Sequence, residues 1–231
     1  MVARILREDV ARVQISALRQ IMKPKLIIFD LFGTLAFPVE KIKREDFFSF
    51  YKKIGIEFKT EQDIKSFISL FAQTNKKATS WRDLSEKLLK GFLGKADLEK
   101  TQALADFYKE NLVYKLYDDV GEVVNLPFQK AILTSGAGFL IKKLGLEKFA
   151  RVFTPKETKF LKPDKRAFLA VLEKLKVKPE QTLMVGDEIE RDLIPAKNLG
   201  MEAILIDREN KVANPPVQKI SSLSELKNIL I

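Results

Sequence analysis

The feature that most constrains the fold is a series of short apolar runs, each followed within a residue or so by a polar or glycine-containing turn. Helical patterns separate the later runs. Repetition of strand, helix and strand predicts right-handed crossover units in a doubly wound parallel sheet, and therefore an α/β fold. The expected strands are 26–29, 131–133, 183–185 and 203–206, and the expected helices between the later ones are 137–144, 164–176 and 191–199.

A long segment interrupts this pattern. From about Val39 to Tyr117 the sequence contains no convincing strand, and its apolar spacing predicts about four amphipathic helices, at 40–53, 60–75, 80–92 and 97–114. We therefore expect an all-helical domain (38–117) inserted into an α/β core (22–37 and 118–231). Aromatic residues are concentrated in this segment, and at helical spacing they are more typical of a bundle core than of a ligand cage. They are Phe47, Phe48, Phe50, Tyr51, Phe67, Phe71, Trp81, Phe92, Phe107 and Tyr108.

The first 21 residues have a separate basic amphipathic pattern. The hypotheses for this segment are an added helix that packs on the domain or on another subunit, and an extension from an upstream start codon.

Composition limits the chemistry. The chain has no cysteine and no histidine, which excludes disulfides, thiol nucleophiles, imidazole bases and thiolate or imidazole metal ligands. Catalysis must then rest on carboxylates, hydroxyls, lysines or a hard metal ion held by oxygen.

The net charge of +10 does not by itself indicate nucleic-acid binding, because the lysines are spread over predicted helix faces and interleaved with acidic residues. A solvated surface that favours small anionic substrates is the better interpretation. No run of about 18 apolar residues exists, and the N-terminus is unlike a signal peptide. We expect a cytoplasmic protein without a membrane segment, as a monomer or homodimer.

Asp30 directly follows the first predicted strand, where open α/β sheets build their sites. Gly33 allows the backbone to turn sharply after it. An aspartate in this position could equally be a turn or cap residue.

Polar side chains also follow two later strands. Thr134 ends the second strand and is followed by Ser135 and Gly136, which leave room for an anion near backbone amides. Asp187 ends another strand, with Asp192 five residues later, and Lys162 precedes a predicted helix.

This order of motifs resembles the haloacid dehalogenase superfamily from about Lys25 to the end of the chain. The resemblance implies a Rossmann-like core, a helical cap of the first type (subfamily I), and catalysis by an aspartate nucleophile. It also implies catalytic roles for Asp30, Thr134 and Lys162 and phosphate binding by Thr134, Ser135, Gly136 and Lys162. The superfamily's four signatures correspond to 30–35, Thr134, Lys162, and Asp187 with Asp192.

Three convergent carboxylates with one lysine would repel one another, and a divalent cation relieves that repulsion. Oxygen ligands suit magnesium better than zinc. By analogy with the superfamily, Mg²⁺ is held by Asp30, Asp187 and the backbone carbonyl of Phe32, with Asp192 acting directly or through water.

Residue 32 departs from the pattern of the superfamily's phosphatases. They carry a second aspartate there, which protonates the leaving group and then activates water. Phe32 can do neither.

The superfamily's 2-haloacid dehalogenases also have a non-acidic residue at this place, and halide needs no proton to leave. Those enzymes, however, lack the metal and typically replace the Gly-Asp pair, whereas this chain keeps Gly186-Asp187 and Asp192.

The sequence therefore favours a Mg²⁺-dependent phosphatase acting on a small phosphorylated metabolite. A 2-haloacid dehalogenase is the alternative, and a catalytically attenuated binding protein is the second alternative. Candidates for the missing proton donor are a water molecule, a substrate with a good leaving group, Glu188, and an acid or lysine that the cap brings down. Glu188 is more typical of a solvated helix start.

Overall fold

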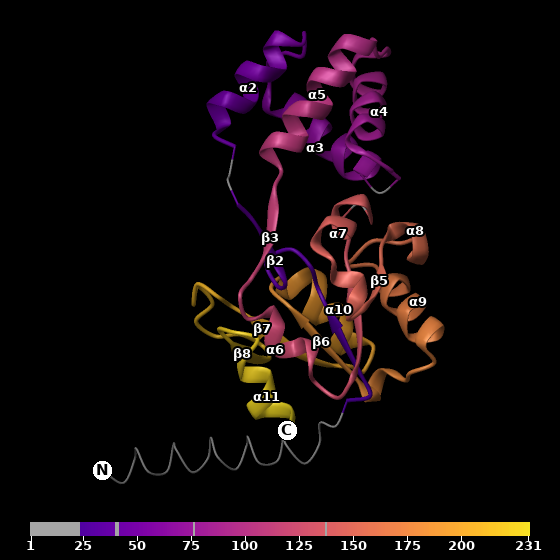
Figure 1. Cartoon of the computed structure of the whole chain (residues 1–231), viewed down its shortest axis with the longest axis vertical. Coiled ribbons are helices and arrows are strands. Elements are labelled where there is room, and N and C mark those ends of the chain that lie inside the picture. The colour runs from indigo at the N-terminus through magenta and orange to yellow at the C-terminus, as the bar shows by residue number, and fades with distance from the viewer. Residues whose placement is uncertain (1–23, 40–41, 76, 137) are drawn as a thin grey trace, which may run out of the picture.

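The computed structural model describes residues 24–39, 42–75, 77–136 and 138–231. The predicted extension 1–21 lies outside them. The described chain forms an α/β body and a separate group of helices, and two thin connections join the two parts (Figure 1). Among the described helices, none is both long and apolar enough to cross a membrane.

The body is built on a six-stranded sheet in the order β5-β4-β1-β6-β7-β8, with every pair parallel. The predicted doubly wound α/β fold is thus confirmed, and four of the strands lie where the apolar runs predicted them. The strands are β1 (Leu26–Phe29), β4 (Gln129–Leu133), β5 (Arg151–Phe153), β6 (Thr182–Gly186), β7 (Glu202–Ile206) and β8 (Gln218–Ile220).

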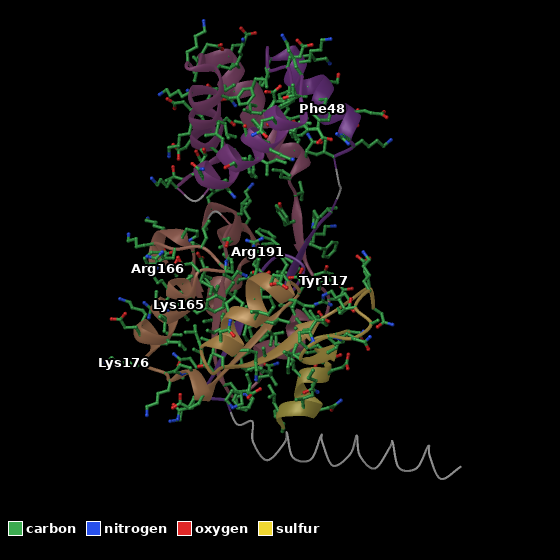
Figure 2. All side chains as sticks on the ribbon, turned by 180° about the vertical axis from the view of Figure 1, so that it is seen from behind. Phe48, Tyr117, Lys165, Arg166, Lys176 and Arg191 are labelled. Carbon is green, nitrogen blue, oxygen red and sulfur yellow. The ribbon has the colours of Figure 1, made fainter. Side chains whose placement is uncertain are left out.

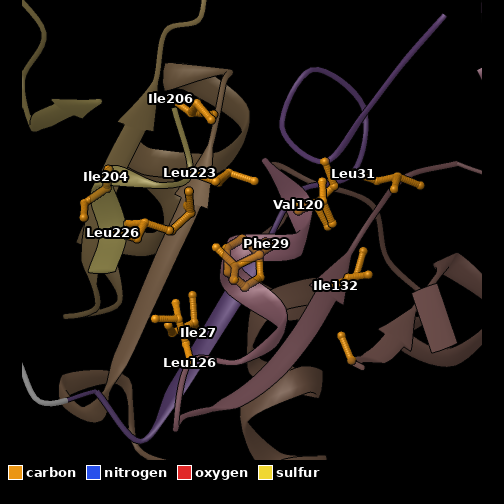
Figure 3. Packing of buried hydrophobic residues seen from close by; sticks show 14 of the residues in the cluster. Ile27, Phe29, Leu31, Val120, Leu126, Ile132, Ile204, Ile206, Leu223 and Leu226 are labelled. Atoms are coloured by element: carbon orange, nitrogen blue, oxygen red, sulfur yellow. The ribbon is translucent and has the colours of Figure 1, made fainter. Parts of the chain in front are cut away.

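The central strand β1 is buried on both faces because helices cover the sheet on each side. Its side chains alternate between two apolar clusters. Ile27 and Phe29 join one cluster, which includes Ile132 and Leu226 (Figure 3), and Leu26 and Ile28 join the other. β1 is thereby fixed in the middle of the sheet, and so is the residue that follows it.

Helices and short turns connect the strands. The predicted helix at 191–199 differs from expectation, because it starts as a π-helical turn (Ile189–Leu193) before α10. Pro195 stands in the first turn of α10 and has no N–H to extend an α-helical ladder backwards. The helices of the body are α6 (Val120–Val124), α7 (Gly138–Leu144), α8 (Pro155–Thr158), α9 (Lys165–Leu175), α10 (Ile194–Asn198) and α11 (Glu225–Leu230).

Four helices form the second part, as predicted. Two of them begin at caps that the sequence supplies: the Ser80 side chain accepts from the Asp83 amide at 3.1 Å, and that of Asp97 from Lys100 at 2.7 Å. The apolar faces of the four helices form a third cluster rich in aromatic rings. In this cluster the rings of Phe50 and Phe107 stack with their centroids 3.9 Å apart. The helices are α2 (Arg44–Lys53), α3 (Glu61–Asn75), α4 (Trp81–Leu93) and α5 (Leu98–Asn111).

The connections between the two parts correct one prediction. We expected a helix to Tyr114 and no strand in this segment, but α5 ends at Asn111 and β3 (Tyr114–Leu116) pairs antiparallel with β2 (Ala36–Pro38). The pairing joins segments almost 80 positions apart, so helical periodicity could not reveal it. This ribbon brings Tyr114 close to Phe32, at the edge of the sheet where the candidate site lies.

Candidate active site

Three aspartates meet at the carboxyl ends of β1 and β6. Asp30 follows β1, Asp187 follows β6, and Asp192 lies in the π-helical turn. Each offers one carboxylate oxygen, and these oxygens all lie within 4.8 Å of one another. The sheet topology causes this meeting, because β1 and β6 are neighbouring parallel strands.

Lys162 is the cation inside this cluster. Its ammonium group donates to Oδ1 of Asp30 and, at 2.6 Å, to Oδ1 of Asp192, and its side chain is only 3% exposed. Burial alone would lower the pKa of Lys162, but the charges of the two carboxylates outweigh burial and raise it. Lys162 therefore remains a charged anchor between Asp30 and Asp192.

Asp187 has no cation beside it in the cluster, and Asp192 shares Lys162 with Asp30. Burial, followed by repulsion from Asp30 and Asp192, raises the pKa of Asp187 to about 7. Burial and repulsion from Asp30 likewise raise the pKa of Asp192 to about 6, against the opposing effect of Lys162. In the absence of a second cation, the cluster thus resists full ionisation near neutral pH.

A hard divalent cation fits this donor set. The three converging groups are all carboxylates, which is the chemistry that magnesium prefers, and Lys162 neutralises only part of their charge. Lys162 donates to Oδ1 of Asp30 and of Asp192, and Oδ2 of Asp192 also accepts from the Glu188 amide at 3.3 Å. Each carboxylate oxygen has a further lone pair with which it can meet an ion. The role of the Phe32 carbonyl stays a prediction.

The turn after Asp30 is shaped to meet Asp187. Gly33 has a φ of +90°, and a Cβ there would lie 2.1 Å from Oδ2 of Asp187, so only glycine fits. The Thr34 hydroxyl donates to Oδ1 of Asp187 at 3.2 Å. The loop thereby holds Asp187 beside the nucleophile candidate.

The end of β4 supplies the hydroxyl groups that the sequence predicted. Thr134 is buried, and its hydroxyl oxygen accepts from the Gly136 amide at 3.0 Å, which leaves its own proton free to donate. The Ser135 hydroxyl is buried and has no hydrogen-bond partner. Both residues line the same pocket as Asp30 and Lys162.

This pocket has a volume of about 240 Å³ and lies between the body and the helices. Glu188 and Arg191 also line it and form an ion pair at 3.2 Å, with Arg191 on the side of the body that faces the helices (Figure 2). The aromatic residues of the helical segment were expected to be bundle core rather than a ligand cage, and two of them, Phe71 and Trp81, pack in the helical cluster and also line the pocket.

Phe32 forms part of the wall next to Asp30. Its ring contacts Tyr114 with centroids 4.5 Å apart. A Cβ at Gly136 would lie 2.7 Å from Cε2 of Phe32, so the glycine makes room for the ring. Burial raises the pKa of Tyr114 above its usual value.

Sequence reasoning missed several residues of the pocket. Arg191 and Tyr114 had no distinguishing pattern, and Asn75 is simply the last residue of α3. Their approach to Asp30 depends on how the helices pack over the sheet, which local sequence patterns do not encode. Every site residue that the sequence did predict lies in the carboxylate cluster or the pocket wall.

A parallel sheet with carboxylates gathered at the ends of its strands is the site arrangement of an α/β enzyme. A family model described as haloacid dehalogenase-like hydrolase matches residues 24–200. The chain belongs to this family and is a hydrolase.

Two relatives by sequence are phosphatases. Glyceraldehyde 3-phosphate phosphatase from Methanothermobacter thermautotrophicus is 36% identical over 97 residues, which are 38% of this chain and 43% of that protein. Phosphoserine phosphatase from Thermus thermophilus is 28% identical over 143 residues, 58% of this chain and 57% of that protein. The matches span only about half of each relative.

Solved structures share the fold. An HAD phosphatase from Thermococcus onnurineus superposes with a TM-score of 0.60 at 24% identity, covering 89% of this chain and 97% of that one. A 2-haloacid dehalogenase from Pseudomonas syringae superposes with a TM-score of 0.66 at 23% identity, covering 90% of this chain and 98% of that one. Fold similarity therefore does not distinguish phosphatase from dehalogenase.

Replacing Lys162 with methionine is expected to lower the free energy of unfolding by about 3–5 kcal/mol, because buried carboxylates lose their cation. Urea denaturation at pH 8 without metal measures the change. Lys165→Met is the matched control, because Lys165 is exposed at the start of α9 (Figure 2), and we expect a change within about 0.5 kcal/mol. Equal effects of the two substitutions would show that Lys162 does not stabilise the cluster.

Asp187→Asn is expected to raise the melting temperature of the metal-free protein at pH 8 by a few degrees. The pKa of Asp187 is about 7 in the fold against an ordinary value of 3.8, so its contribution to stability is lost as pH rises through about 7. The stability of the variant should lack that pH dependence. In the presence of Mg²⁺ the wild type should instead have the higher melting temperature, because only the wild type binds the ion well. Asp118→Asn, a change at an exposed residue, controls for net charge. A melting temperature of metal-free Asp187→Asn below that of the wild type would contradict the repulsion.

Proposed function

We propose that this protein is a Mg²⁺-dependent phosphatase that uses Asp30 as its nucleophile on a small phosphorylated molecule. The observation that carries the proposal is the cluster of Asp30, Asp187 and Asp192, with Lys162 between two of them. In this proposal the helices α2–α5 act as a cap that closes over the substrate and excludes bulk water.

The chain's own groups suggest how the reaction proceeds. An Asp30 oxygen attacks phosphorus in line with the departing oxygen, while Lys162 holds the carboxylate in position. The hydroxyls of Thr134 and Ser135 and the nearby amides donate to the phosphoryl oxygens. Mg²⁺, bound by Asp30, Asp187, Asp192 and the Phe32 carbonyl, would neutralise the carboxylates and the charge on the phosphoryl group. Water then releases phosphate and regenerates Asp30.

Dehalogenation of a 2-haloacid is the second candidate, and Phe32 is the observation that favours it. The ring next to Asp30 has no proton to give, and a halide ion leaves without one. In that reaction Asp30 would attack carbon instead of phosphorus.

Two observations favour phosphoryl chemistry. A dehalogenase needs no cation, yet this chain retains Asp187 and Asp192 at a cost in mutual repulsion. The relatives by sequence described above are also both phosphatases.

A substrate-class comparison tests the proposal. Phosphate esters with Mg²⁺ and 2-chloro acids without metal are offered to the wild type and to Asp30→Asn. We expect phosphate release only from the wild type and only with Mg²⁺. Metal-independent chloride release without phosphatase activity would refute the proposal in favour of the dehalogenase, and inactivity toward both classes would favour a binding protein.

A further inference from the structure

Among the described residues that line the pocket, no acidic side chain is free to protonate the departing oxygen. Phe32 occupies the wall next to Asp30, and carbon atoms cannot transfer a proton. Lys162 already donates to two carboxylates, and the Glu188 carboxylate accepts from Arg191. An ester whose leaving oxygen needs a proton would therefore react slowly in this site.

The wall that the segment from α3 to β3 contributes to the pocket is mainly aromatic and carries no charge, whereas the charged pair Glu188 and Arg191 lies on the side of the body. The segment from α3 to β3 contributes Phe71, Trp81, Leu112 and Tyr114, and none of the residues it adds to the described lining is acidic or basic. Phe32 faces the same space through its contact with Tyr114. Rings of this kind bind a planar aromatic group well by stacking and edge-to-face contact, whereas a carboxylate or ammonium group against this wall would lose its hydration without gaining a counter-charge from the wall's residues.

An amide side chain also belongs to this wall. Asn75 lines the pocket, and its buried Oδ1 atom has no hydrogen-bond partner among the residues that the structure describes. An unpartnered buried amide oxygen is costly, so a donor on the substrate would restore the missing hydrogen bond.

We propose that the substrate is a phosphate ester of a small aromatic hydroxyl compound that carries a hydrogen-bond donor on its ring. This inference rests on the phosphatase function proposed above and names its substrate class. Its basis is the coincidence of an aromatic pocket, an unpartnered Asn75 amide and a non-acidic residue 32.

The acidity of the leaving group explains why an aromatic substrate suits a site with a non-acidic residue 32. A phenol-type hydroxyl has a pKa of about 10, so the aryloxide departs without prior protonation. An alkyl alcohol is about as weakly acidic as water, far weaker than a phenol, and departs poorly as the anion. Asp30 forms a bond to phosphorus as the bond to the aryl oxygen breaks, and the aryloxide takes its proton from solvent. Water then attacks the phosphorus, Asp30 leaves as the carboxylate, and the water proton goes to solvent.

Phenyl phosphate and cyclohexyl phosphate are the matched test pair, because the two rings are similar in size and differ in leaving-group acidity. In Mg²⁺ the wild type is expected to give a kcat/KM for phenyl phosphate at least about a hundredfold higher. Phenol should also be released in a burst, since Phe32 cannot activate water in the second step.

Hydrolysis of the two esters with kcat/KM values within fivefold would overturn the inference while leaving the phosphatase function standing. If Tyr114→Phe or Glu188→Gln then selectively slowed cyclohexyl phosphate, that residue would be the proton donor, again against the inference. Hydrolysis of neither ester, with chloride release from a 2-chloro acid, would instead refute the proposed function itself.

Asn75→Leu tests the polar contact at nearly constant side-chain size. The ratio of kcat/KM for hydroxymethyl-substituted phenyl phosphates to that for phenyl phosphate should fall about tenfold for at least one ring position. Gln73→Leu, an exposed change on the same helix, is the control and should keep the wild-type ratio. An unchanged ratio in Asn75→Leu at every ring position would show that Asn75 does not bind the ring substituent.

Discussion

Replacing Asp30 with asparagine is expected to lower kcat/KM for aryl phosphates by at least about 10⁴-fold. The amide keeps the size of the side chain but cannot attack phosphorus as an anion. It also removes one of the carboxylates that meet Lys162 and the other aspartates, so Mg²⁺ affinity should fall as well. Initial rates at several Mg²⁺ concentrations separate these two effects.

Saturating Mg²⁺ should not restore the activity of Asp30→Asn, because the missing nucleophile is independent of metal occupancy. Asp106→Asn, an exposed change on α5, should retain the wild-type rate and controls for the change in net charge. Activity of Asp30→Asn within tenfold of the wild type at high Mg²⁺ would mean that another group attacks the substrate.

Replacing Phe32 with aspartate is expected to raise kcat/KM for alkyl phosphates by about 10²- to 10⁴-fold. Residue 32 follows Asp30 by two positions in the wall of the pocket, where a carboxyl group could protonate the departing oxygen and later activate water. Aryl phosphates should gain much less, because their leaving groups need no proton. Parallel rate measurements on an alkyl and an aryl ester give the comparison.

Phe32→Leu separates proton transfer from loss of the ring. It also loses the contact with Tyr114 but adds no acid. Alkyl phosphate hydrolysis should stay at the wild-type level or below in Phe32→Leu. An equal gain in the leucine and aspartate variants would show that the ring only blocks the pocket, and no gain in either would show that residue 32 does not limit this reaction.

The sheet could be predicted well from the sequence because its central strands are buried on both faces and are therefore continuous apolar runs. Leu26–Phe29 is the clearest case, since the predicted and observed bounds agree. The edge strand Arg151–Phe153 is shorter and more exposed, so it lacked that signal. The ribbon formed by Ala36–Pro38 and Tyr114–Leu116 depends on pairing between distant segments and was missed for that reason.

The carboxylate cluster could be predicted for a similar reason. Residues that end neighbouring parallel strands meet at one edge of the sheet, so Asp30 and Asp187 had to lie close together. Asn75 and Tyr114 reach the pocket only through the packing of the helices and the ribbon over that edge. Their places depend on tertiary contacts that no local spacing predicts, although these residues carry the inference about the substrate.

Mass spectrometry of the acid-quenched enzyme tests the central claim most directly. Wild-type protein is mixed with Mg²⁺ and phenyl phosphate, quenched within the first turnovers and digested. We predict that one phosphoryl group is found on the peptide containing Asp30 and that it is absent without Mg²⁺ and in Asp30→Asn. Turnover of the ester with no phosphoryl group on that peptide, or with the group on another residue, would contradict the account.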